Sequence, residues 1–207
     1  MLTPERIKEA GEFVEWLRQS LHGQELPQSN RVRAAGACFA IAQGHHHAIV
    51  LLIENRLYSS SFALIRLEFE AYIRGLWFSH CAKDSQIDRY ISGKKCNFLE
   101  TNRLIGDIEE KFADLEQTLS MIKSKSWSAM CEYTHTGGLH VQRFNTNAGI
   151  EPNYSDEEIE EVLKFSENIG AMSVIGVAEL GDLKEIESRV IDRLVETGKR
   201  STEGRRP

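Results

Sequence analysis

The stretch YSSSFALIRLEFEAYIRGLWFSHCA, residues 58–82, decides the fold that we expect of this chain. It contains no proline and a single glycine, and its apolar side chains occur on every side of a helical wheel. A helix with this pattern is buried on all sides. We therefore predict that residues 58–82 form the central helix of an all-α domain.

The charged residues of this helix share one narrow arc. At 100° per residue, the arc holds Ser59, Arg66, Glu70, Arg74, Trp77 and Cys81. Among the charged residues only Glu68 lies opposite. Because a buried charge is costly unless it is paired, Arg66, Glu70 and Arg74, here called the charged stripe, indicate either an internal ion-pair ladder or the wall of a polar site. The sequence leaves both interpretations open.

The composition is that of a soluble globular protein with one core. The chain has 207 residues, of which 41% are hydrophobic and 27% charged. Four prolines and the lack of an alternating run favour helix throughout. We expect a compact bundle of about seven or eight helices in a single domain, residues 1–198, followed by a disordered basic tail, residues 199–207.

Charge and cysteine content restrict the function classes. A net charge of −6 argues against non-specific coating of nucleic acid but leaves room for a local basic groove. Cys38, Cys81, Cys96 and Cys131 form no Cys-x-x-Cys pair and are expected to be reduced thiols. With no signal-peptide layout and no uncharged run of bilayer length, we expect a cytoplasmic protein without membrane contact, metal or cofactor.

The rest of the chain is expected to form helices around residues 58–82. Thr3 precedes Pro4 and caps a first helix that ends near Leu21. The alanine-rich helix that follows is expected to form an antiparallel hairpin with residues 58–82. Further helices are expected over residues 83–92, 97–123 and 127–133, followed by a long loop. Ser155 opens a capping box, and Gly181 divides the last two helices.

His45, His46 and His47 are consecutive, so on a helix they point in three directions and cannot share one metal ion. His47 shares a face with Gly44 and Leu51. We expect His47 to point into the same cleft as the charged stripe and to contact a ligand. The alternative is that all three histidines are structural.

The segment from Glu132 to Arg143 contains two separate candidates. Glu132 and His135 have the Glu-x-x-His spacing of di-iron bundles, but those sites need the motif twice, so no metal is expected. His135 also precedes a Gly-Gly pair that lets a backbone approach a ligand, with His140 as a second base and Arg143 as an anion contact. The alternative is a glycine helix cap with His135 as a hydrogen-bonding residue at the helix end.

Arg74 and His80 are separated by five residues, which is the arrangement used by the HEPN ribonucleases. Cleavage of RNA without a metal needs a group that moves the 2′-hydroxyl proton and a cation that stabilises the phosphorane, and His and Arg supply both. The residue after Arg74 is glycine, whereas that family usually has a polar residue there.

The sequence HHHAIVLLIENRLYSSSFALIRLEFEAYIRGLWFSHCAKD, together with YTHTGG, resembles an uncharacterised bacterial family of helical proteins that is distantly similar to HEPN and abortive-infection proteins. The resemblance covers residues 34–84 and 133–138. It implies an all-α fold, a homodimer, and a role in phage defence or stress. It implies no established reaction.

Two functional hypotheses follow. In the first, the protein is a HEPN-like, metal-independent ribonuclease toxin or defence effector. His135 or His80 acts as general base, Arg74 and Arg66 hold phosphate, and Glu70 orients the arginines. In the second, it is a non-catalytic module that binds a small anionic ligand or a protein partner, and the charged stripe is structural. The expected partners are thus a second copy of the chain, RNA or another protein.

Overall fold

The computed structural model describes residues 2–94 and 99–203, and over these residues the fold is all-α, as predicted. The described residues form nine α-helices and no strand beyond the isolated bridge between Asn145 and Ile150. The helices are α1 (Pro4–Leu21), α2 (Asn30–Glu54), α3 (Tyr58–His80), α4 (Asp84–Ile91), α5 (Thr101–Lys111), α6 (Thr118–Thr134), α7 (Gly138–Gln142), α8 (Asp156–Leu180) and α9 (Lys184–Glu203), with a 3-10 turn η1 (Ala113–Leu115) between α5 and α6.

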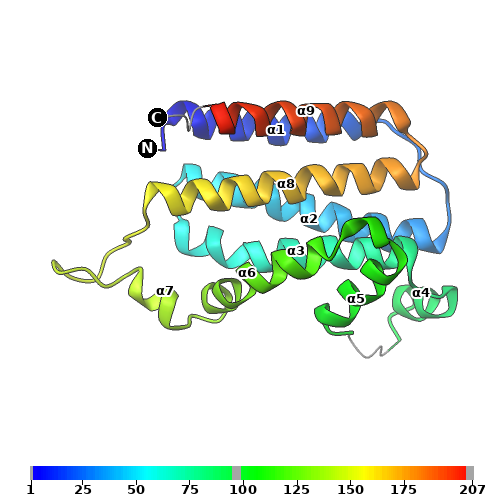
Figure 1. Cartoon of the computed structure of the whole chain (residues 1–207), viewed down its shortest axis with the longest axis horizontal. Helices are drawn as coiled ribbons and strands as arrows, with labels where there is room; N and C mark the ends of the chain where they lie inside the picture. The colour runs from blue at the N-terminus through cyan, green and yellow to red at the C-terminus, as the bar shows by residue number, and fades with distance from the viewer. Residues whose placement is uncertain (1, 95–98, 204–207) are drawn as a thin grey trace.

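The five long helices α1, α2, α3, α8 and α9 run side by side, and the shorter helices cover one side of α3 (Figure 1). Helix α3 packs against α2, α5, α6 and α8, so it is the central helix that the sequence predicts. Helices α1 and α9 form an outer layer on α8 (Figure 1).

The ring of Phe39 packs between helices α2, α3 and α8. Phe39 of α2 is fully buried and lies against Gly75 of α3 and Gly176 of α8. A Cβ atom at either glycine would lie 2.5 Å from the ring, which is too close for any real contact. The two glycines therefore set how closely α2 approaches α3 and α8.

The helix ends follow the local sequence. Thr3 Oγ1 accepts a hydrogen bond from Arg6 N at 3.1 Å, and Ser155 forms the capping box with Glu158. Helices α2 and α3 are joined by three residues and form the expected antiparallel hairpin, in which Ser61 Oγ donates to Ile49 O at 3.4 Å. These two capping residues and this hairpin confirm the predicted start of α1, the start of α8 and the α2–α3 connection.

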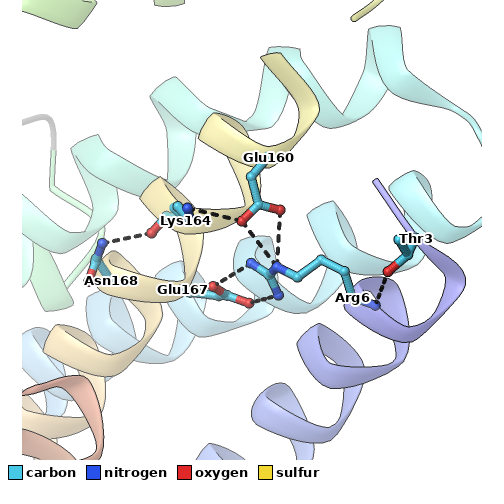
Figure 2. Close-up of polar contacts among 6 residues, drawn as sticks. All are labelled: Thr3, Arg6, Glu160, Lys164, Glu167 and Asn168. Atoms are coloured by element: carbon cyan, nitrogen blue, oxygen red, sulfur yellow. Dashed lines mark hydrogen bonds and ion pairs between the residues drawn. The ribbon is translucent and has the colours of Figure 1, made fainter. Parts of the chain in front are cut away.

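Arg6 fixes the outer helix α1 on α8 (Figure 2). Its two terminal nitrogens donate to the two carboxylate oxygens of Glu167 at 2.8 Å each. Its Nε atom donates to Glu160 at 3.0 Å. Such bidentate Arg–carboxylate geometry is the strongest form of ion pair.

Three boundaries differ from the prediction. Helix α6 runs unbroken to Thr134, α7 lies inside the predicted long loop, and α9 extends to Glu203. Residues 199–203 of the predicted tail are thus helical, and residues 204–207 lie outside the described residues. Cys38, Cys81 and Cys131 are free thiols, whereas Cys96 lies outside the described residues.

By length and composition, one helix among the described residues, α2, is apolar enough to cross a membrane, with a mean hydropathy of 1.3 in its best window. Of that window 39% is buried inside the protein. A core helix passes the same test, so this is weak support for membrane insertion.

Candidate functional site

Arg66 lies at the centre of a polar cluster between α3 and α6. Its Nε atom donates to Glu70 Oε1 at 2.9 Å, one helical turn further along α3. Its Nη1 atom lies 2.7 Å from His135 Nε2 and donates more weakly to the Cys131 sulfur at 3.6 Å. The structure thus brings together three of the predicted site residues, Arg66, Glu70 and His135.

The contact between Arg66 and His135 fixes the tautomer of the imidazole. A guanidinium has no acceptor, so Nε2 of His135 accepts the hydrogen bond and the ring proton lies on Nδ1. His135 itself is exposed and follows the last residue of α6, where its N–H donates to Cys131 O at 2.9 Å. The imidazole therefore stands at a helix end with Nδ1 free of the Arg66 contact.

Two cations lie beside one indole ring. The Arg66 Cζ atom is 4.7 Å from the centre of the Trp127 ring, and the Lys123 Nζ atom is 4.1 Å from it. Lys123, Trp127, Cys131 and His135 follow one another at four-residue steps, so α6 presents them on one face. Both distances are within the range of cation–π attraction.

An open groove of about 560 Å³ runs along this face of α6. It is lined by Lys123 and Trp127, by Cys131 and Glu132, by apolar Ile105, and by small polar side chains, namely Asn102, Ser120, Ser124 and Ser128. The groove therefore offers one ammonium group, an aromatic surface and several hydrogen-bonding groups, with Arg66 beside Trp127.

Glu132 does not act together with His135 as a pair of metal ligands. Its carboxylate turns toward the next helix and accepts a hydrogen bond from Leu139 N at 3.1 Å. A Cβ atom at Gly137 would lie 2.2 Å from Glu132 Oε2, so Gly137 leaves room for this carboxylate. Among the described residues no group of three or more His, Cys, Asp or Glu side chains could hold a metal ion.

His140 and Arg143 lie in an aromatic cluster beneath α7. The ring of His140 packs edge-on against Tyr133 with 5.5 Å between the ring centres, and Arg143 forms an ion pair with Glu158. His140 Nδ1 and Arg143 Nε are buried and have no hydrogen-bond partner within the described protein. The anion contact expected of Arg143 is therefore partly occupied by a carboxylate of α8.

Arg74 lies within electrostatic range of Cys38 on α2, and His80 lies away from the cluster around Arg66. Burial raises the pKa of Cys38 to about 11, and the charge of Arg74 offsets part of this rise. His80 Nε2 is 3.4 Å from Glu179 of α8. His80 lies fourteen positions after Arg66, which is about 21 Å along a helix. His80 thus cannot replace His135 beside Arg66.

The expected position of His47 is wrong. His47 is exposed, as are Gly44 and Leu51, so the shared face of the prediction exists but points to solvent. The pKa of the Glu15 carboxylate on α1 is lowered to about 2, mainly by its hydrogen bond with Arg18. His47 also contributes to this lowering, so it lies toward α1. His47 therefore faces away from the charged stripe. The sequence could not reveal this because α2 is apolar on every side.

Two buried polar residues and one cation were missed as candidates. Glu68 and His46 are almost fully buried between α2, α3 and α8, and Lys123 lies in the groove. The isolated position of Glu68 opposite the charged stripe was the only hint of its burial. Lys123 lies in an amphipathic segment, where a charge usually indicates a solvated face.

The fold and the site define an all-α protein with a polar and aromatic groove beside its central helix. Residues 39–197 match the model of a family of unknown function (DUF6988), and the chain belongs to this family. Comparison with curated proteins and with solved structures gave no match. The resemblance to an uncharacterised helical family is thus confirmed, and the further likeness to HEPN and abortive-infection proteins is not.

Proposed function

We propose that the protein binds a small phosphorylated ligand in the groove on α6. The observation that carries the proposal is the position of Arg66, which Glu70 holds beside Trp127 while a second cation, Lys123, lies at the same ring. Two cations around one aromatic surface suit a ligand that has both an anionic and a planar part.

The electrostatics of the cluster favour an anion. Arg66 has one carboxylate partner, Glu70, whereas Lys123 forms no salt bridge among the described residues. A phosphate placed between these two cations would form charge-assisted hydrogen bonds. Ser120 and Ser124 already donate to Glu109 and Met121, so Ser128 is the groove serine whose hydroxyl would donate to the phosphate. The site resembles a binding pocket that is already formed.

The experiment is isothermal titration of the protein with inorganic phosphate, pyrophosphate and AMP, using wild type, Lys123→Ala and Lys125→Ala. Lys125 is an exposed lysine of the same helix and serves as the matched control. We expect Lys123→Ala to weaken binding at least about tenfold and Lys125→Ala to leave it unchanged. Equal affinities of the two variants, or no binding of any probe by wild type at millimolar concentration, would contradict the proposal.

A second candidate function, metal-independent RNA cleavage by a cytoplasmic defence effector, is favoured by the 2.7 Å contact between Arg66 and His135. In this reaction Arg66 would turn from His135 Nε2 to the phosphate, which frees Nε2 to take the 2′-hydroxyl proton. The 2′-oxygen would attack phosphorus to give a 2′,3′-cyclic phosphate, and the 5′-oxygen would leave with a proton returned by the imidazolium or supplied by water. Arg66 would stabilise the charge on the phosphorane, and Glu70 would orient Arg66. His80, which lies beside Glu179, would not take part.

Incubation of the protein with total RNA and tRNA in the presence of EDTA separates the two candidates. Cleavage by wild type that disappears in folded His135→Ala would support the ribonuclease. Phosphate binding without cleavage, retained in His135→Ala, would support the binding module alone.

A further inference from the structure

Helix α2 has an outer face that is largely exposed, and residues 26–28 border only the groove near its first turns. At 100° per residue, one arc of this helix holds the residues here called the α2 outer face: Arg33, Ala37, Ala40, Ile41, Gly44, His47, Ala48, Leu51 and Glu54. Most of them are exposed, including Ile41 with 54% and Leu51 with 46% of the surface accessible. The apolar character of α2 therefore exceeds what the core of one chain needs.

The face is self-complementary about its smallest residue. Gly44 lies at its middle, and a Cβ atom there would meet nothing within 4 Å. Seven residues before Gly44, Ala37 lies in an open groove of about 660 Å³ that Gly36 and Ala40 also line. Seven residues after Gly44, Leu51 projects from the same face. If a second α2 crosses antiparallel at Gly44, Leu51 of each copy enters the groove of the other.

The charges at the two ends of the face are also complementary. Arg33 lies eleven residues before Gly44 and Glu54 lies ten residues after it, so an antiparallel crossing places each beside the other in the second copy. Among the described residues neither Arg33 nor Glu54 has an ion-pair partner within the chain. A parallel pair would instead place like charges side by side.

We propose that two copies of the chain associate antiparallel through the α2 outer face, with the two-fold axis at Gly44. A two-fold contact uses the same surface on both subunits, which this self-complementary face provides. The α6 groove is lined by residues of α5 and α6 and by none of the α2 outer face. The dimer is therefore independent of the proposed ligand site, and the failure of one would not affect the other.

Cysteine cross-linking tests the geometry directly. A residue on the two-fold axis meets its own copy, so Gly44→Cys should give a disulfide-linked dimer under mild oxidation. Leu51→Cys should not, because two Leu51 positions lie about 21 Å apart along an antiparallel pair. Wild type, which has the native cysteines alone, shows how much cross-linking those cysteines give by themselves. Equal cross-linking of both variants would indicate a parallel pair and overturn the proposal, as would no cross-linking of Gly44→Cys.

Sedimentation velocity over a range of concentrations tests the energetics. Wild type should approach twice the 23.5 kDa of one chain, and Leu51→Glu should remain monomeric, whereas Ile191→Glu on the exposed side of α9 should not change the assembly. Arg33→Glu and Glu54→Arg should each weaken the dimer at least about tenfold, and the double variant should restore it. A monomeric wild type, or a dimer that Leu51→Glu leaves intact, would overturn the proposal.

Discussion

At the scale of single residues, Glu68 and His46 show how the core treats titratable groups. Glu68 is fully buried, and its Oε1 atom accepts a hydrogen bond from Ser166 Oγ at 3.0 Å, while Oε2 has no partner within the described protein. His46 lies against Gly170, one helical turn beyond Ser166 on α8. Burial raises the pKa of Glu68 well above its usual range and lowers the pKa of His46 to about 4. Burial thus favours the neutral form of both side chains.

The first prediction concerns the protonation of His46. The folded state favours the neutral ring, so the free energy of unfolding should fall as the pH drops from about 6.5 to about 4. The difference between the ordinary pKa of 6.5 and the folded-state pKa of about 4 corresponds to about 3 kcal/mol in the free energy of unfolding. Denaturant unfolding of wild type and of His46→Gln across this pH range measures the effect. Two parallel stability profiles would show that His46 contributes nothing.

The second prediction concerns Glu68, for which the sign is opposite. Its folded-state pKa is raised, so the stability present below about pH 4.5 is lost as the pH rises toward the folded-state pKa. The isosteric Glu68→Gln cannot ionise, so its stability does not fall as the pH rises. Its melting temperature should therefore exceed that of wild type at pH 8 but not at pH 4. A wild type that melts higher than Glu68→Gln at pH 8 would contradict a neutral buried carboxyl.

At the scale of elements, the predictable features are those determined by neighbours in the sequence. The capping residues Thr3 and Ser155 and the ion pair of Arg66 with Glu70 involve residues three or four positions apart, so pattern alone identified them. The contact of Arg66 with His135 joins residues far apart in the chain and could only be guessed. For α2, apolar residues on all sides concealed which face meets solvent, and the expected position of His47 failed for that reason.

The third prediction tests the glycine contacts of Phe39. Gly176→Ala would place a methyl group 2.5 Å from the buried ring, so α2 or α8 must shift. We expect a loss of about 1–3 kcal/mol in the free energy of unfolding, measured with denaturant. Gly106→Ala is the control, because that helical glycine has nothing within 4 Å, and alanine there should be neutral or stabilising. Equal stability of the two variants would contradict the close packing.

The fourth prediction concerns the attachment of α1. Arg6→Met should leave Glu167 without its cation, while Glu160 keeps Lys164 at 3.3 Å, and should destabilise the protein by about 2–4 kcal/mol in denaturant unfolding. Arg18→Met removes an exposed arginine of the same helix that pairs with Glu15, and should change stability little. The idea that Arg6 holds α1 fails if both substitutions have the same effect.

At the scale of the whole molecule, the all-α class followed from the hydrophobic periodicity and the scarcity of proline, because these properties are distributed along the whole chain. The site depended on where α6 packs against α3, which no local pattern specifies. The family match covers residues 39–197, so it includes α3, α6 and the groove, but not α1. We therefore expect the ligand site to belong to the family core and α1 to act as a cover for α8.

The central claim is that Arg66 belongs to a ligand site and not to a structural ion-pair network. The most direct test compares Arg66→Gln with wild type in two measurements, the free energy of unfolding and the affinity for pyrophosphate by isothermal titration. If Arg66 belongs to a ligand site, Arg66→Gln should bind pyrophosphate at least about tenfold more weakly than wild type, while its free energy of unfolding changes by less than about 1 kcal/mol. A loss of several kcal/mol in stability with unchanged affinity would contradict the account and identify Arg66 and Glu70 as a structural pair.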